Sequence, residues 1–154
     1  MCYIIGMLIN QSRILKMWIP IDTNDEIFCE MATRRPQKTG LPMTIWVDDG
    51  KWYQQSGHGK RIKFQLDPSE KNTNGFGVMD LNGVVLHPNR IKTLSANDIK
   101  KVSNFVLNNQ YALDKLSDML IDIDDIWPFI IRGGEPASFE EISKLNLKVD
   151  ELIG

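Results

Sequence analysis

Residues 33–66 read TRRPQKTGLPMTIWVDDGKWYQQSGHGKRIKFQL, and this stretch decides the fold class. Residues 43–48 and 61–66 alternate apolar and polar side chains, which is the period of a strand with one buried face. The Asp-Asp-Gly sequence at 48–50 predicts a tight hairpin turn, because glycine accepts the positive φ that such turns need. We expect residues 51–55 to form the return strand. The stretch therefore predicts an antiparallel sheet.

The same stretch is rich in basic residues. From Thr33 to Lys63 the sequence has seven basic and two acidic residues, a local balance of +5. In the segment 61–66, the polar positions 61, 63 and 65 share one face, which predicts a strand with a basic outer face. Trp46 and Trp52 flank the turn, and they either stack on bases from the outer face or pack in the core. The candidate nucleic-acid-binding residues are Arg34, Arg35, Lys51, Trp52, His58, Lys60, Arg61 and Lys63.

The residues before this stretch predict a peripheral hairpin. Residues 3–9 form a short bulky apolar run, residues 10–12 are turn residues, and residues 14–19 end at Pro20, which suits the end of a strand. The polar sequence ATRRPQKTG at 32–40 reads as a mobile connector. Alternatively, Met31 is a second possible start of the folded unit.

Beyond the stretch, the pattern changes from strands to helices. Residues 67–77 read as a loop, and residues 78–81 and 84–86 pair around Asn82-Gly83, a type I′ turn signal. Ser95 with Asp98 resembles a capping box and opens one helix, or two divided at Asn108-Asn109. Ser138 with Glu141 opens a short helix. The apolar residues at helical spacing are Ile99, Val102, Val106, Leu113, Leu116 and Leu120 in the first region, and Phe139, Ile142 and Leu145 in the second.

Strands followed by helices predict an α+β fold, with an antiparallel sheet built from hairpins and C-terminal helices on one face. A chain of 154 residues has the length of one domain with its own core. We expect a single domain over 1–154, β-rich over 31–93 and helical over 94–154. The hairpin at 1–30 is peripheral to it or outside the folded unit.

Composition indicates a folded protein without a membrane segment. The chain is 42% hydrophobic and 25% charged, with a net charge of −2. Its apolar N-terminal run is too short to cross a bilayer and lacks the basic region of a signal peptide. Cys2 and Cys29 have no zinc or redox spacing and read as small apolar residues. We expect a cytoplasmic protein.

Catalytic chemistry has little support in the sequence. The only histidines are His58 and His87, and no Ser-His-Asp order or nucleophile elbow is present. His58 lies between two glycines. It is an exposed general base, a contact to phosphate, or a turn residue without a role. The sequence GHGK at 57–60 lacks the spacing of a P-loop. We expect no catalytic residue, cofactor or metal, and an enzyme using His58 with a nearby carboxylate is a third reading.

The C-terminal half is acidic. From Asp114 to Glu151 there are ten acidic and four basic residues, a local balance of −6. The aspartates at 114–125 lack the spacing of a calcium loop, and those at 122–125 predict a solvated helix end. The run Trp127–Ile131 is typical of a core or dimer element. The charge difference between the two halves has two readings: both are ordinary solvated faces, or together they form a functional dipole.

From Gly40 to about Leu120, the chain contains Gly-Leu-Pro, a tryptophan-bearing hairpin, GHGKRIKF at 57–64, a long loop, and a helix opening at Leu94-Ser95 and running through Leu116. This order resembles a small bacterial family of domains of unknown function, with a histidine-rich strand and a C-terminal helix, often encoded in toxin–antitoxin-like gene pairs. In that family the strand is marked by several histidines and a Pro-Pro pair. Of its histidines this chain keeps His58, with Arg61 and Lys63 where the others would stand.

Our leading hypothesis is a small non-enzymatic binding protein whose basic, tryptophan-containing hairpin surface contacts nucleic acid, with an affinity that falls steeply with salt. The alternative is a protein-binding regulator or inhibitor of phage or mobile-element type. It would act on a host or partner protein through the acidic C-terminal half, and its binding would tolerate salt. A homodimer fits either hypothesis.

Overall fold

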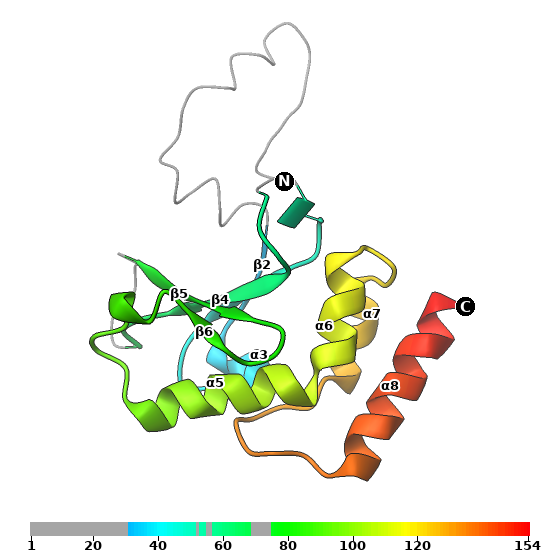
Figure 1. The fold of residues 1–154 in the computed structure, drawn as a ribbon. Helices are drawn as coiled ribbons and strands as arrows, with labels where there is room; N and C mark the ends of the chain where they lie inside the picture. The colour runs from blue at the N-terminus through cyan, green and yellow to red at the C-terminus, as the bar shows by residue number, and fades with distance from the viewer. Residues whose placement is uncertain (1–30, 52, 55–56, 69–74) are drawn as a thin grey trace, which may run out of the picture.

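The computed structural model describes residues 31–51, 53–54, 57–68 and 75–154. The expected hairpin at 1–30, the two cysteines and Trp52 lie outside the described residues. Five described strands form one antiparallel sheet in sequential order: β2 (Met31–Arg34), β3 (Ile45–Asp48), β4 (Arg61–Gln65), β5 (Phe76–Asp80) and β6 (Val85–Leu86). Figure 1 shows the sheet with the helices gathered below and beside it.

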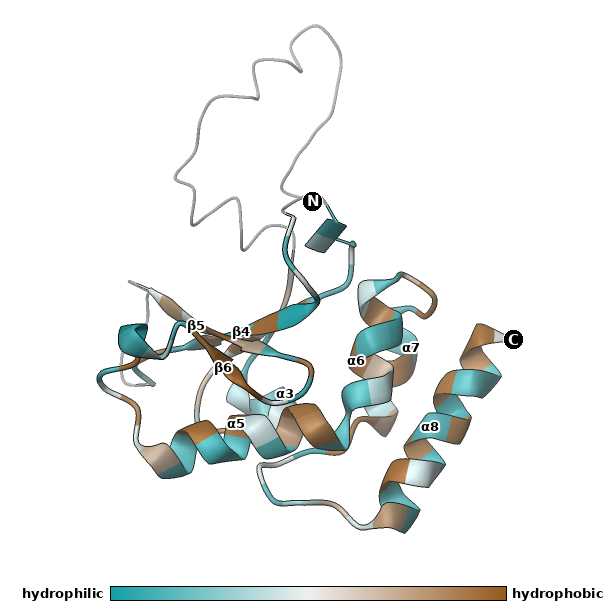
Figure 2. Ribbon diagram, viewed as in Figure 1, coloured by the Kyte–Doolittle hydropathy of each residue, from teal (hydrophilic) through white to brown (hydrophobic). Residues whose placement is uncertain are grey.

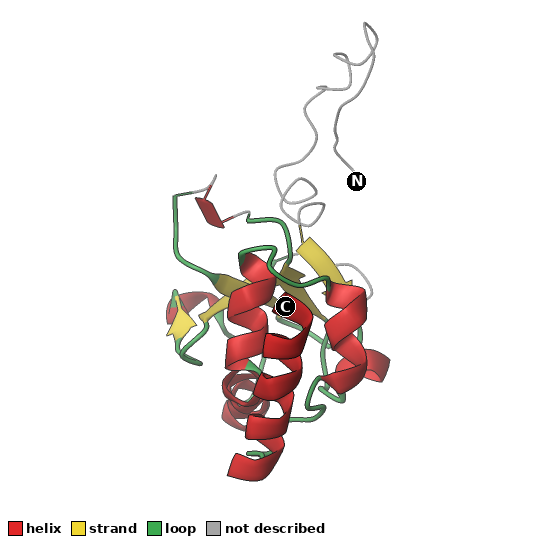
Figure 3. Ribbon diagram, turned by 90° about the vertical axis from the view of Figure 1, so that its right-hand side faces the viewer, coloured by secondary structure: helices red, strands yellow, loops and turns green. Residues whose placement is uncertain are grey.

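The helices follow the sheet in sequence, as expected for an α+β fold. They are α5 (Ala96–Asn108), α6 (Gln110–Ser117), α7 (Ile123–Ile126), the 3-10 turn η2 (Trp127–Phe129) and α8 (Phe139–Ile153). Two short turns, α3 (Pro36–Thr39) and η1 (Pro88–Arg90), lie beside the strands. In the view of Figure 3 the long helices stand in front of the sheet. The predicted fold class is confirmed.

One face of the sheet meets the helices in a single apolar core. The sheet contributes Ile45, Val47, Ile62, Phe64 and Met79, and α5 and α6 contribute Val102, Phe105, Val106, Leu113 and Leu116. Helix α8 adds Leu145 and Val149 to this core, and its exposed surface mixes hydrophilic residues with the apolar Phe139, Leu147 and Ile153 (Figure 2). Burial of this apolar area is the main driving force for packing the helices on the sheet.

The opposite face of the sheet is also buried, which corrects two expectations. Trp46, Lys63 and Val78 are direct neighbours across β3, β4 and β5, and their exposed fractions are 6%, 0% and 1%. The strand at 43–48 is therefore buried on both faces rather than half-buried. Strand β4 has no basic outer face, because Lys63 is completely buried and Gln65 nearly so.

The segment at 32–40 is not a mobile connector. Its first residues belong to β2, and Pro36 begins α3, where proline suits the first helical turn. Three hydrogen bonds tie α3 to the C-terminal region: Trp127 Nε1 donates to the Lys38 carbonyl at 3.2 Å, Arg132 to that of Gln37 at 2.7 Å, and the Gly133 N–H to that of Thr39 at 2.7 Å. These contacts give the segment a fixed place in the fold.

The expected hairpin at 48–55 is wrong. The Asp48 side chain accepts hydrogen bonds from the backbone N–H groups of Gly50 at 3.1 Å and Tyr53 at 3.3 Å. These bonds turn the chain away from β3 and leave Tyr53 and Gln54 helical. The partners of β3 in the described sheet are β2, which precedes it, and β4, which begins at Arg61. An aspartate that bonds its own downstream backbone competes with a strand ladder.

The second expected hairpin is confirmed, with a different turn. Strands β5 and β6 pair around residues 81–83, since the Asp80 N–H donates to the Val84 carbonyl at 3.0 Å, and the Gly83 N–H donates to the Asp80 carbonyl at 3.1 Å. Gly83 has φ of 78°, whereas Asn82 has no positive φ. The connection is therefore a three-residue loop with glycine in the left-handed position, not a type I′ turn.

The predicted helix boundaries are largely confirmed. The Ser95 side chain caps α5 by accepting from the Asp98 N–H, and Ser138 and Glu141 form a complete capping box on α8. The division at Asn108-Asn109 is also present. Helix α8 is longer than expected, at 15 residues, and Phe139 is exposed rather than apolar core. No helix in the described ranges is long and apolar enough to span a membrane.

Candidate functional site

The predicted nucleic-acid-binding residues do not form one exposed basic surface. Lys60 is the clearest case, because its ammonium group bonds the carboxylates of Asp114 at 2.7 Å and Asp118 at 2.6 Å. It also lies 5.4 Å from the ring centre of Tyr53, whose hydroxyl donates to Asp118. These contacts raise the pKa of Lys60 against the opposing effect of burial, and hydrogen bonds from Lys60 and Tyr53 lower that of Asp118.

Lys63 and Arg34 are also used inside the fold. Lys63 lies over the Phe76 ring at 5.5 Å, and burial lowers its pKa to about 8. The Arg34 guanidinium lies 4.7 Å from the ring centre of Trp127 and 3.8 Å from Asp124. Both side chains therefore make contacts within the protein that would compete with binding to a nucleic-acid phosphate.

The remaining predicted residues are spread over different elements. Arg35 is exposed at the start of α3, and Lys51 is partly exposed with φ of 58°. The His58 ring nitrogen Nδ1 lies 2.9 Å from the Gly59 carbonyl, and burial lowers the pKa of His58. Arg61 is partly buried at the start of β4. Binding of nucleic acid through all eight residues thus stays a prediction, with three of its cations engaged elsewhere.

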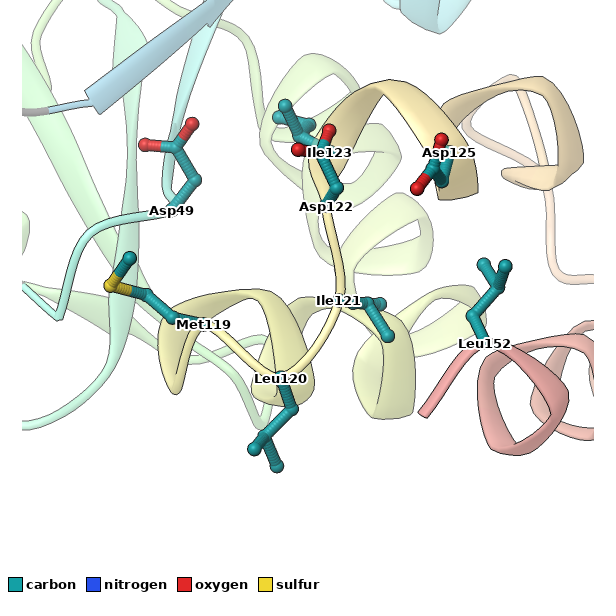
Figure 4. A pocket seen from close by; sticks show the side chains of 8 residues that line it. All are labelled: Asp49, Met119, Leu120, Ile121, Asp122, Ile123, Asp125 and Leu152. Carbon is teal, nitrogen blue, oxygen red and sulfur yellow. The ribbon is translucent and has the colours of Figure 1, made fainter. Parts of the chain in front are cut away.

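A hollow of about 300 Å³ lies where α6 ends, beside α7 and the end of α8. Three carboxylates line it, Asp49, Asp122 and Asp125. Figure 4 shows Asp49 and Met119 on one side and Leu152 on the other. The apolar residues of its wall are Met119, Leu120, Ile121, Ile123 and Leu152. We call this site the acidic hollow.

The backbone at the end of α6 explains why apolar side chains are exposed there. The Met119 N–H donates to the Leu116 carbonyl, and the Leu120 N–H to the Lys115 carbonyl, both at 3.0 Å. This pair of bonds is the Schellman motif, which requires a left-handed residue where glycine is usual. Met119 fills that position with φ of 59°. Its side chain is 60% exposed and that of Leu120 is 50% exposed, which corrects the expected place of Leu120 in the core.

The carboxylates of the acidic hollow are fixed by local structure. Asp122 caps α7, and its Oδ1 accepts from the Asp124 N–H at 2.8 Å, as expected for a helix end. Asp49 comes from the turn after β3. Burial, followed by repulsion from Asp48, raises the pKa of Asp49, and Asp122 contributes in the same direction.

Few cations compensate these carboxylates. In the ranges that the structure covers, no lysine or arginine forms an ion pair with Asp49, Asp122 or Asp125. Among the described residues, the one ion pair on α7 joins Asp124 to Arg34 at 3.8 Å, and Asp124 itself is exposed. The described residues also contain no group of three histidine, cysteine or acidic side chains arranged to hold a metal ion.

The geometry therefore offers an open site with negative charge and an apolar rim. Sequence reasoning read Asp122 and Asp125 as part of a solvated helix end and Asp49 as part of a hairpin turn, but it missed the apolar part of the site. The available signal was Met119-Leu120, two large apolar residues directly after the end of a helix. Comparison of the chain with protein-family models, curated proteins and solved structures gives no match.

Proposed function

We propose that this protein is a non-enzymatic, protein-binding regulator whose acidic hollow binds a basic, apolar segment of a partner protein. The observation that carries the proposal is the combination of three carboxylates with exposed Met119 and Leu120 in one hollow. A large apolar side chain on the surface costs solvation, and groups of them beside a hollow are typical of interaction sites.

Charge complementarity defines the partner segment. Lysine or arginine side chains would neutralise Asp49, Asp122 and Asp125, and leucine-like side chains would cover Met119 and Leu120. An amphipathic helix with one cationic and one apolar face carries both groups in a single short element. Methionine suits such a site because its flexible side chain adapts to different apolar surfaces.

The left-handed backbone of Met119 supports the proposal. A side chain with a Cβ in this conformation costs about 1 kcal/mol relative to glycine, and such strain is concentrated at functional positions. Glycine would complete the Schellman motif without this cost. The presence of methionine at the rim is consistent with a role for its side chain in contact with a partner.

The test is fluorescence anisotropy with a dye-labelled amphipathic peptide of lysine and leucine residues. We expect saturable binding to the wild type, reduced about tenfold by Asp122→Asn/Asp125→Asn, since each lost charge contact contributes on the order of 0.5–1 kcal/mol. Asparagine keeps the capping ability of residue 122, so the fold should survive.

The matched control is Glu135→Gln/Glu140→Gln, which removes two exposed acidic side chains outside the hollow and changes the net charge equally. If the control weakens binding as much as the hollow variant, attraction is non-specific and the site is wrong. The proposal also fails if Met119→Ser leaves the affinity unchanged, because the apolar rim then contributes nothing.

A further inference from the structure

The chain enters the described fold beside the acidic hollow. Met31, the first residue of β2, lies opposite Asp48 of β3 in the register of the sheet. Asp49 follows Asp48 directly and lines the hollow. Opposite residues of antiparallel strands lie about 5 Å apart and successive Cα atoms about 3.8 Å, so the backbone of Met31 is within about 10 Å of that of Asp49. In Figure 4, β2 is the pale blue strand above Asp49.

Strand β2 also reaches a helix that lines the hollow. Arg34, the last residue of β2, lies 3.8 Å from Asp124 of α7, and its guanidinium lies over the ring of Trp127. Asp122 and Asp125, which flank Asp124 in the sequence, line the hollow. The segment that precedes β2 is therefore attached at the edge of the hollow.

The sequence before β2 contains a run with the chemistry that the hollow accepts. Residues 13–19 read RILKMWI, with two basic, five apolar and no acidic side chains. Arg13 and Lys16 are the only basic residues before Met31. Their charges complement the carboxylates of the hollow, and the apolar side chains of the run match its apolar rim of Met119 and Leu120.

The connection is long enough for this run to reach the hollow. Residues 20–30 join the run to β2, and a chain of this length spans up to about 36 Å when it is extended. A segment tethered so close to its site has an effective concentration on the order of 1 mM. Even a weak affinity is then sufficient to keep the site occupied for much of the time.

We infer that residues 13–19 bind in the acidic hollow of the same molecule and compete there with the partner segment. The inference rests on the proposed function, because the competitor is the basic, apolar segment which that function requires. The contact within the molecule is autoinhibitory. A partner must bind more tightly than the tethered run in order to displace it.

The first test is zero-length cross-linking of the wild-type chain of 154 residues with a carbodiimide. The reagent takes up the water that is lost when a carboxylate and an amine form an amide. We expect peptide mapping by mass spectrometry to find Lys16 joined to one of the three aspartates of the hollow, in the monomer. Absence of these links would overturn the inference. Links that join two chains, seen as a covalent dimer on a denaturing gel, would assign the run to the hollow of a second copy and would also overturn it.

The second test measures the affinity of the lysine–leucine peptide for the full chain carrying Arg13→Glu/Lys16→Glu. Release of the run frees the hollow, so the affinity should rise about three- to tenfold, as expected for a tethered segment with a Kd of about 0.1–0.5 mM. The matched control Lys92→Glu/Lys100→Glu changes the net charge equally at two exposed lysines outside the hollow. An equal rise in the control, or no rise in the variant, would overturn the inference.

The two proposals fail separately. If the Lys16 link is present and neither the wild type nor the variant binds the peptide, the proposed function is wrong and the contact within the molecule stands. If the wild type binds the peptide and the link is absent, the partner site stands and the autoinhibitory contact is wrong.

Discussion

Met119 occupies a backbone conformation that its side chain disfavours, and the cost is measurable. Because glycine has no Cβ, Met119→Gly should raise the free energy of unfolding by about 0.5–1 kcal/mol, observed by urea denaturation. The control is Met119→Ala, which keeps a Cβ at the same φ and should not stabilise. Equal stabilisation by both variants would mean that the gain comes from removing exposed apolar surface rather than from backbone strain.

The same substitution separates stability from binding. Met119→Gly removes the exposed thioether at the rim of the acidic hollow, so we expect a more stable protein with a weaker affinity for the lysine–leucine peptide. A trade of this kind between stability and activity is common at functional positions. Unchanged affinity would leave the methionine side chain without a role in recognition.

Lys63 makes stability depend on alkaline pH. Its pKa is about 8 in the folded protein, below the ordinary value of 10.5. At pH values between about 8 and 10.5, Lys63 binds a proton in more of the unfolded chains than of the folded ones. The contribution of Lys63 to the free energy of unfolding therefore rises as the pH increases from about 8 to 10.5, and it is lost as the pH falls through 8. Its full size is about 3 kcal/mol.

The measurement is urea unfolding of wild type and Lys63→Met at several values between pH 7 and 10.5. The difference between the two free energies should shift in favour of the wild type as pH rises. Lys38→Met, at an exposed lysine, should run parallel to the wild type. A constant difference between wild type and Lys63→Met across this range would show that Lys63 titrates normally.

The sequence could not reveal the burial of Lys63. Alternation in 61–66 correctly predicts a strand and its apolar face, because the side-chain period follows from backbone geometry. It does not show whether the second face meets solvent. Lysine is rarely buried, and that general preference led to the wrong expectation of a basic outer face.

At the scale of elements, the packing of β5 against the Phe64 ring of β4 requires a residue without a side chain at position 77. A Cβ on Gly77 would lie 2.3 Å from the ring of Phe64, which is completely buried. We expect Gly77→Ala to lower the free energy of unfolding by about 1–3 kcal/mol through overpacking. Gly59→Ala is the control, since a Cβ there meets nothing within 4 Å and no positive φ is required. Similar costs at both positions would point to a general effect of glycine on the unfolded chain.

The junction of α5 and α6 fixes the segment that leads to α8. Asn109 Oδ1 accepts from the Ile131 N–H at 2.8 Å, and its Nδ2 donates to the carbonyls of Phe105 and Ile131 at 2.9 Å. Asn109→Ala should cost about 2–3 kcal/mol, because the partly buried Ile131 N–H loses its acceptor. Hydrogen exchange should accelerate at Ile131 in particular. Asn104→Ala, which removes a single bond to Gly134, should cost less.

Sequence patterns predicted elements well where the deciding contacts are local. The caps at Ser95 and Ser138 and the division at 108–109 follow from side chains bonding nearby backbone, so the sequence carries the signal. The turn after β3 was missed because Asp48-Asp49-Gly50 fits a hairpin equally well. In the structure the Asp48 side chain accepts from the backbone N–H groups of Gly50 and Tyr53 instead, and the Tyr53 hydroxyl donates to Asp118, 65 residues away.

At the scale of the molecule, the opposite charges of the two halves partly neutralise each other. Lys60, from the basic stretch, bridges two aspartates at the end of α6, and Arg34 reaches Asp124 on α7. Carboxylates at a helix C-terminus oppose the helix dipole, so a cation there is doubly favourable. Part of the charge difference between the two halves of the sequence is therefore used in ion pairs within the fold and not in a dipole that binds a partner.

A double-mutant cycle measures this contact. Lys60→Met and Asp118→Asn should show a coupling of about 1 kcal/mol at pH 7, with Lys115→Met as a control that leaves the pair intact. The pKa of Asp118 is lowered in the fold, so its contribution is present above the ordinary value of 3.8 and is lost as pH falls below it. The stability gap between wild type and Asp118→Asn should therefore close in acid. A gap that persists at pH 2 would assign the effect to packing.

The sites were harder to predict than the fold. The aspartates at 122–125 and the basic residues at 34–63 stand out in the sequence, yet their partners come from distant elements. The acidic hollow joins a turn after β3 to the ends of α6 and α8. Only tertiary packing brings such residues together.

The sequential order of the described strands has a consequence for synthesis in the cell. Because each of β3 to β6 pairs with the strand made just before it, the sheet can assemble as the chain leaves the ribosome. Helices α5 and α6 emerge only afterwards. During that interval the face with Ile62 and Phe64 has no cover, so the half-made chain offers chaperones an apolar surface that the finished protein hides.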